Sequence, residues 1–183
     1  MTADLPDSFS PHQPVHPHPA CADPERLLHE CEIQRTRAGG PGGQHRNKVE
    51  TAIRIVHNPT GLTALATERR SQEQNRSVAI QRLRLLLAIE LRTVSGSDVY
   101  PSDLWTSRCR SGRIQCNDEH SDFPALLAEA MDAVDAKNYD VRVAAAALGC
   151  STSQLVRFLA KQTDALKKVN DAREQRGLRR LKP

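Results

Sequence analysis

Apolar and polar residues alternate along the stretch from Val49 to Ile55. Alternation with a period of two indicates a strand that is buried on one face. Pro59 and Gly61 then favour a turn, because proline fixes φ and glycine permits a positive φ, and residues 62–67 resume an extended pattern. The sequence therefore predicts two strands that pair as an antiparallel hairpin. The positions on the buried face are Val49, Thr51, Ile53 and Ile55.

Helical periodicity follows the hairpin, because apolar residues recur at intervals of three and four. The first predicted helix runs from about Gln72 to Arg92 and packs on the hairpin, with Ser71 and Gln74 as a capping box. The later predicted helices are Phe123 to Ala136 with Ser121 or Asp122 as N-cap, Val141 to Leu148 stopped by Gly149, a helix capped by Ser151 and Gln154, and Asp164 to Arg176 ended by Gly177.

These elements predict an α+β fold, in which a small β-hairpin-plus-helix domain is followed by a small all-α, helix-turn-helix-like domain. The first residues are rich in proline and poor in apolar side chains, which is typical of a disordered tail. The predicted division is a tail at 1–24, the α+β domain at 25–95, a linker at 96–120 with a short strand near 113–116, and a helical domain with a basic C-terminal tail at 121–183.

Composition narrows the class of protein further. Hydrophobic residues make up 38% and aromatic residues 3% of the 183 residues, and no apolar run approaches the roughly 20 residues that cross a bilayer. The first 25 residues contain no Lys or Arg and no apolar run, so we expect a soluble, cytoplasmic protein. Five cysteines, an odd number, favour reduced thiols. Cys109, Cys116 and His120 have poor spacing for zinc, so no metal is expected.

Charge is unevenly distributed around the net charge of +4. Residues 25–92 hold twelve Lys and Arg against seven Asp and Glu, and residues 154–183 hold nine against three. The intervening residues 93–153 hold five Lys and Arg against nine Asp and Glu. Clustered bases indicate a protein that binds a polyanion, because phosphate contacts release counterions. A merely solvated basic face is the alternative.

The most informative motif is glycine-rich, with four glycines among residues 39–43 followed by Gln44. Glycine buries no side chain and has the largest backbone entropy, so this run serves backbone geometry and not a core. Flanked by Arg37, Arg46 and Lys48, such a loop can bring backbone N–H groups against something bulky and anionic, which RNA is. A flexible glycine linker beside a strand is the alternative.

The segment RAGGPGGQHRNKVETAIRIVHNPTG, residues 37–61, together with ERRSQEQNR, residues 68–76, resembles the catalytic domain of class I peptide chain release factors and their short ribosome-rescue relatives. The signature of that family is Gly-Gly-Gln, and the resemblance covers about residues 31–92. It implies a ribosome-dependent peptidyl-tRNA hydrolase, which cuts the ester between nascent peptide and tRNA in the peptidyl-transferase centre. The implied partners are the ribosome, through its large-subunit rRNA, and peptidyl-tRNA, with no membrane, no metal and no small-molecule cofactor.

The resemblance also implies roles for individual residues. Gln44 would offer its backbone N–H to the developing oxyanion and its side-chain amide to the attacking water, while Gly42 and Gly43 would permit the backbone angles that aim it. The expected RNA contacts are Arg37, Gly39, Gly40, His45, Arg46, Asn47, Lys48, Arg69, Arg70 and Arg76.

The sequence departs from the family at several points. Arg46 stands where the family usually has valine. Nothing matches the stop-codon-reading domain of a full-length release factor, so codon-independent ribosome rescue is the expected activity. Residues 144–161 instead resemble a helix-turn-helix of the Fis type, with an ordinary αα-hairpin as the alternative. A non-catalytic RNA- or DNA-binding regulator that acts through these helices is therefore the rival function.

Overall fold

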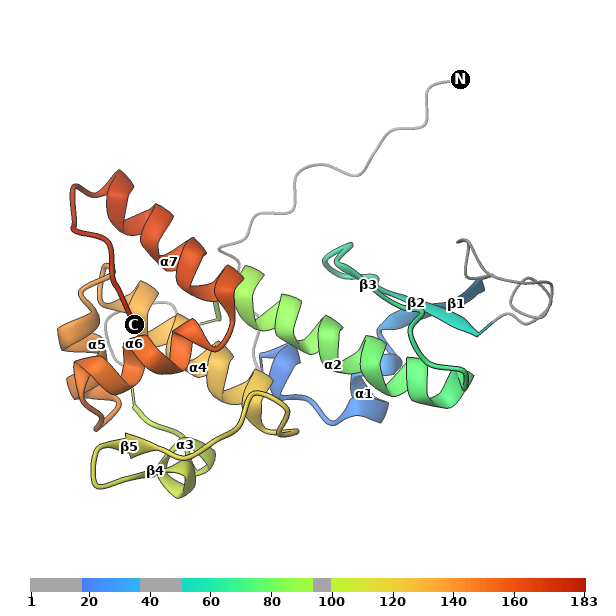
Figure 1. Cartoon of the computed structure of the whole chain (residues 1–183), viewed down its shortest axis with the longest axis horizontal. Coiled ribbons are helices and arrows are strands. Elements are labelled where there is room, and N and C mark those ends of the chain that lie inside the picture. Colours follow the sequence, from blue (N-terminus) through green and yellow to red (C-terminus); the bar gives the residue numbers. More distant parts are fainter. Residues whose placement is uncertain (1–17, 37–50, 94–99) are drawn as a thin grey trace.

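The computed structural model describes residues 18–36, 51–93 and 100–183, which form helices and two small sheets, as an α+β fold requires (Figure 1). The N-terminal elements are a 3-10 helix, η1 (Pro19–Cys21), α1 (Pro24–Leu28), β1 (Cys31–Thr36), β2 (Ala52–His57), β3 (Thr63–Ala66) and α2 (Gln72–Glu90). The C-terminal elements are α3 (Asp103–Arg108), β4 (Cys109–Arg110), β5 (Arg113–Ile114), α4 (Phe123–Ala136), α5 (Val141–Ala147), α6 (Thr152–Ala160) and α7 (Thr163–Gln175).

The larger sheet has three antiparallel strands in the order β1-β2-β3. The β2–β3 pairing confirms the predicted hairpin, although β2 begins at Ala52 and Val49 lies outside the described residues. The sheet has one strand more than the predicted hairpin, because β1 pairs with β2 as an edge strand. Ile33 pairs with Ile55 on the face that α2 covers, yet Ile33 is 39% exposed because β1 lies at the edge.

One face of this sheet is covered by α2, as the helical periodicity predicts. Ile53, Ile55, Ala64 and Ala66 are buried there. Gly61 has φ +70° in the turn between β2 and β3, the conformation for which glycine is suited. The expected capping box is wrong, since Ser71 precedes α2 without a side-chain capping hydrogen bond.

Residues 18–24, assigned by the sequence analysis to a disordered tail, are ordered and packed in the structure. Asp23 accepts a hydrogen bond from Glu25 N–H and caps α1. Pro19 and Ala20 are buried in η1, which packs against α2 and α4. The predicted tail therefore does not include residues 18–24, and residues 1–17 lie outside the described part of the chain.

The helical part agrees closely with its predicted elements. A buried ring cluster of Trp105, Phe123 and Phe158 joins α3, α4 and α6, with Phe123 and Phe158 centroids 5.1 Å apart. Ser151 Oγ accepts from Gln154 N–H at 3.2 Å and so caps α6 as predicted. Asp122 precedes α4 but makes no capping hydrogen bond, because its carboxylate accepts from Arg108 instead.

Part of the segment interpreted as a linker, 96–120, forms regular structure. The described residues from 100 onward include α3 and the β4–β5 hairpin, whose second strand falls within the stretch predicted to be extended. Trp105 is buried and donates its indole N–H to the Leu148 carbonyl at 2.8 Å. Packing on a distant element thus orders a segment whose own sequence shows little periodicity.

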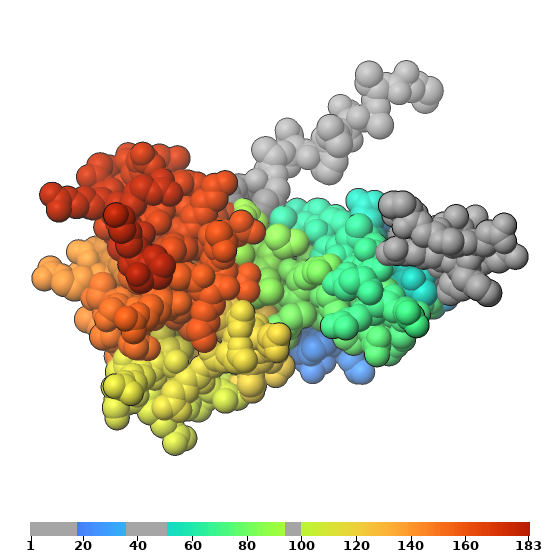
Figure 2. All heavy atoms as spheres, in the orientation of Figure 1, coloured from blue at the N-terminus to red at the C-terminus, as the bar shows by residue number. Residues whose placement is uncertain are grey.

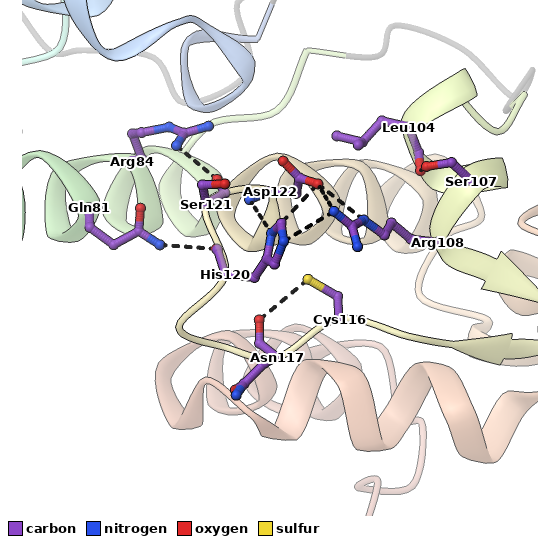
Figure 3. Close-up of polar contacts among 10 residues, drawn as sticks. All are labelled: Gln81, Arg84, Leu104, Ser107, Arg108, Cys116, Asn117, His120, Ser121 and Asp122. Atoms are coloured by element: carbon purple, nitrogen blue, oxygen red, sulfur yellow. Dashed lines mark hydrogen bonds and ion pairs between the residues drawn. The ribbon is translucent and has the colours of Figure 1, made fainter.

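The sheet end and the helical end of the molecule meet along α2, whose green surface lies between the cyan sheet and the orange and red helices in Figure 2. Buried residues from both ends belong to one hydrophobic cluster. The buried Arg84 side chain donates to the carbonyls of Ala20 and of Ser121, and Gln81 donates to the carbonyl of His120 (Figure 3). The division of the chain into domains stays a prediction, but these contacts make α2 an element that both ends share.

No single helix among the described residues is long and apolar enough to cross a membrane, and the bent pair α5 and α6 reaches that length and hydropathy only when both helices are counted together. No group of three or more His, Cys, Asp or Glu side chains in these residues is arranged to hold a metal ion. All five cysteines are free thiols, as expected.

Candidate functional site: the root of the glycine loop

The glycine motif lies in the connection between two strands that are neighbours in the sheet. Thr36 at the end of β1 pairs with Ala52 at the start of β2, so the chain leaves and re-enters the sheet at the same end of these two strands. The predicted catalytic residues Gly42, Gly43 and Gln44 lie outside the described residues. So do the expected RNA contacts Arg37, Gly39, Gly40, His45, Arg46, Asn47 and Lys48. What the structure describes is the root of this loop.

Asn75, in the first turn of α2, is the residue that organises the root. Its side chain is fully buried, and its amide donates to the Thr51 carbonyl at 2.6 Å and to the Arg69 carbonyl at 3.0 Å. Its carbonyl oxygen accepts from the Arg69 N–H at 2.9 Å. A buried amide with all these bonds made is a rigid tie, since losing one partner would leave polar groups unsatisfied. Asn75 thereby joins the start of β2 to the segment before α2.

This tie holds the start of α2 and the segment before it, which carry the expected RNA-contacting arginines, at the loop root. Figure 1 shows the start of α2 beside the end of the larger sheet. Arg69 and Arg70 are exposed, and within the described part of the chain neither makes an ion pair. Arg76 is half-buried and lies 3.9 Å from Glu73. Of the ten predicted RNA contacts, these three are described, and the structure brings them to the end of the sheet where the glycine motif is attached.

Local acids at this end are already paired with bases. Glu68 forms an ion pair with Arg82 at 2.6 Å. The Thr67 backbone N–H, which donates to this carboxylate, holds the pKa of Glu68 below its ordinary value, with Arg82 adding to the effect. Glu68 is therefore ionised and directed to Arg82, which leaves the charges of Arg69 and Arg70 available to an external anion.

Sequence reasoning missed Asn75 as a positioning residue, although it lies within the segment that carries the family resemblance. The signal was available in the helical pattern: Asn75 is one turn before Ala79, on the stripe of α2 that is buried. A polar residue on a buried stripe must find hydrogen-bond partners. Which partners it finds could be known only from the fold.

Comparison with known proteins covers the same part of the chain. The family model of the RF-1 domain matches residues 27–121. Peptide chain release factor PrfB1, chloroplastic, of Arabidopsis thaliana is 52% identical over 60 residues, which is 33% of this chain and 13% of that protein. Peptide chain release factor 1 of Caldicellulosiruptor bescii is 52% identical over 58 residues, or 32% and 16%. Peptide chain release factor 1 of Symbiobacterium thermophilum is 43% identical over 74 residues, or 40% and 21%. The chain thus matches about a fifth or less of the length of each of these relatives.

Proposed function

Because the chain belongs to the class I peptide chain release factor family through its RF-1 domain, we propose that it hydrolyses the peptidyl-tRNA ester on the ribosome. The observation that carries this proposal is the match of the RF-1 domain over the segment that contains the glycine motif. The loop root supports it, since the motif connects neighbouring strand ends next to exposed arginines.

In the proposed mechanism the chemistry falls to a few atoms of the loop. An ester is already activated toward acyl transfer, so the factor must position a water and stabilise the tetrahedral oxyanion. Gln44 supplies a backbone N–H for the oxyanion and a side-chain amide that orients the water, and Gly42 and Gly43 allow the backbone angles this needs. The rest of the pocket is built by ribosomal RNA and the tRNA.

The arginines and the loop root have a supporting role in this proposal. Arg69, Arg70 and Arg76, with the basic residues of the loop, contact phosphates of rRNA or tRNA. Asn75 holds Thr51 and Arg69 in a fixed relation. The arginine that contacts phosphate and the root of the loop therefore keep one relative position when the loop enters the catalytic centre. A displacement of about 1 Å in such a centre can cost about a hundredfold in rate.

We further propose that release is independent of a stop codon and serves ribosome rescue. The match to the RF-1 domain ends at residue 121, and the helices α4 to α7 that follow it resemble no codon-reading segment. A cytoplasmic site of action remains part of the proposal, and one similar release factor is chloroplastic.

Single-turnover release from ribosomes that carry peptidyl-tRNA tests these proposals, with a stop codon, a sense codon or no codon in the A site. Comparable rates in all three complexes support codon independence, whereas release confined to the stop codon contradicts it. Gln44→Ala should abolish release while leaving ribosome association, measured by pelleting, nearly intact. An unchanged release rate in this variant would remove the mechanism.

The rival function, a nucleic-acid-binding regulator acting through α5 and α6, has one observation in its favour. The axes of these helices differ in direction by 101° across a break of four residues or fewer, within the range of helix-turn-helix units. The release assay separates the two functions, because a regulator without catalytic activity releases no peptide from any of the three complexes.

A further inference from the structure

The β4–β5 hairpin is fastened to the turn between α5 and α6. The Ser151 N–H donates to the Gly112 carbonyl at 3.3 Å, and the Cys109 thiol donates to the Gly149 carbonyl at 3.7 Å. From the helix before the hairpin, the Trp105 indole donates to the Leu148 carbonyl. Three of the four residues in the interhelical turn are therefore bonded to α3 or the hairpin, which makes the hairpin and the helix pair one unit.

The same hairpin runs beside α6 along most of its length. Gly112 meets Ser151 at the start of α6, and the carbonyl of Cys116 accepts from the Lys161 ammonium just past its end. Four extended residues span about 13 Å, close to the roughly 15 Å rise of ten helical residues. Arg113 in β5 is exposed, and β5 contacts α6. The outer stripe of α6 is formed by Ser153, Arg157 and Lys161, which are four residues apart and exposed.

At its tip the hairpin holds two arginines in an arrangement that costs stability. Ser111 and Gly112 both have positive φ, 49° and 72°, so they form a two-residue turn of the type that closes hairpins tightly. This turn sets Arg110 directly opposite Arg113, although like charges in cross-strand pairs repel. Both side chains are exposed, and no ion pair to either is present among the described residues.

Acidic residues are absent from this unit even though the surrounding sequence is acidic. Residues 109–117 and 141–161 contain five Lys and Arg and no Asp or Glu. At the base of the hairpin Asp122 is paired with Arg108 at 2.6 Å (Figure 3), and Asp118 and Glu119 follow in the chain. Within the described residues no ion pair to Arg110, Arg113 or Arg157 is present, so these charges can meet a polyanion outside the protein.

From this geometry we infer that the β4–β5 hairpin and the outer stripe of α6 form a binding surface for double-stranded RNA. The charges come from two neighbouring elements, β5 and α6, so the surface can contact more than one phosphate of a duplex. The first turn of α6 carries the short side chains of Ser151, Thr152 and Ser153 and a single amide, Gln154, so few base-reading residues stand where DNA-binding helices carry them. Recognition by shape and phosphate is the mode expected for duplex RNA. The choice of RNA over DNA rests on the proposed ribosomal function. The surface itself is argued from the structure alone.

The test measures binding of the full chain to a fluorescein-labelled 20-bp RNA duplex and to a DNA duplex of the same sequence, by anisotropy from about 50 to 200 mM salt. Arg113→Glu with Arg157→Glu should weaken RNA binding about tenfold or more, and the slope of log affinity against log salt should fall by about two. The control, Arg26→Glu with Arg179→Glu, reverses two exposed charges elsewhere and should weaken binding less than threefold.

Three outcomes would overturn the inference: no binding to either duplex at 50 mM salt, equal losses in the two double variants, or tighter binding of DNA than of RNA. Circular dichroism melting checks that the variants fold. If the double glutamate variant does not fold, Arg113→Ala with Arg157→Ala takes its place. Gln44→Ala is measured in the same assay and should bind duplex RNA like the unaltered chain. A failure of peptide release and a failure of RNA binding are thereby observed separately.

Discussion

The two ends of α2 serve different parts of the molecule and are packed by different means. At its N-terminal end, α2 covers the sheet with small and aliphatic residues, and one buried amide, Asn75, makes the long-range polar contacts. At its C-terminal end it meets α4, beside a core that contains all the buried aromatic rings of the described residues. A buried ion pair, between Arg92 and Asp132 at 3.1 Å, joins the segment directly after α2 to α4.

This difference separates stability from function along one helix. Large rings bury the most apolar area for each residue, so the helical end should dominate the free energy of unfolding. The sheet end buries less and leaves arginines exposed beside the glycine loop. Substitutions at the helical end should therefore act on stability with little effect on the release rate per folded molecule, and substitutions at the sheet end should do the reverse.

The largest effect on stability is expected from Asp132→Ala. This change leaves the buried Arg92 guanidinium without its counter-charge and removes the acceptor of the Thr93 hydroxyl and N–H. Breaking a buried pair in this way costs about 3–5 kcal/mol, measurable by urea unfolding. Release per folded molecule should be unchanged.

A double replacement tests whether the uncompensated charge is the cause. Arg92→Met with Asp132→Leu removes both charges and should lose less stability than Asp132→Ala alone. If the double variant is the less stable of the two, packing at this site outweighs electrostatics. A loss of release activity in folded Asp132→Ala would break the separation between the two ends.

A smaller loss of stability with a larger loss of activity is expected from Asn75→Ala. The substitution leaves the Arg69 N–H and the carbonyls of Thr51 and Arg69 without their partner, at a cost of about 1–3 kcal/mol. Single-turnover release, corrected for the folded fraction, should fall because the loop root loses its tie. Ser77→Ala, which removes an exposed hydroxyl from the same helix, is the control. Full activity in Asn75→Ala would show that the tie is structural only.

The smallest effect on stability is expected from a change of pH, through His57 at the sheet end. His57 is 1% exposed, and its ring nitrogens lie 2.8 Å from Thr60 Oγ1 and 3.3 Å from Glu30 Oε2. Burial lowers the pKa of His57 from its ordinary 6.5, against the opposing effect of Glu30. The folded state thus binds this proton less readily than the unfolded state.

His57 therefore makes the free energy of unfolding depend on pH. Its contribution to stability is complete above pH 6.5 and is lost as the pH falls from 6.5 through the lowered pKa, because the unfolded state binds the proton first. Denaturant unfolding between pH 7.5 and 5 should show this decline, and His57→Gln should flatten it. His29→Gln removes an exposed imidazole and controls for the loss of a histidine as such. An equal decline in His57→Gln would assign the pH dependence to other groups.

Several elements could be predicted because their information is local. The alternation around Ile53 and Ile55 and the turn at Gly61 specify the β2–β3 hairpin, and the spacing of apolar residues specifies α2, α4 and α6 within a few residues. The capping of α6 by Ser151 was also predictable, because cap and helix are adjacent in the chain.

Other features escaped prediction because their signal is weak or distant. On the face that α2 covers, β1 offers a single large apolar side chain, Ile33, so its alternation is indistinct. The ordering of residues 18–24 depends on α2 and α4, and that of α3 and the β4–β5 hairpin depends on contacts with the α5–α6 turn. None of these partners is near in sequence.

The amino-acid sequence by itself determined the α+β class, the longer helices to within a few residues, and the glycine motif with its family resemblance, because periodicity and motifs involve residues that are neighbours in the chain. Only the tertiary structure decided that Asn75 ties Thr51 to Arg69, that α2 is shared by both ends, and that the arginines of a small hairpin lie beside α6. These features are hydrogen bonds and packing between segments far apart in sequence, and a pattern along the chain states which side chains must be buried without stating against what.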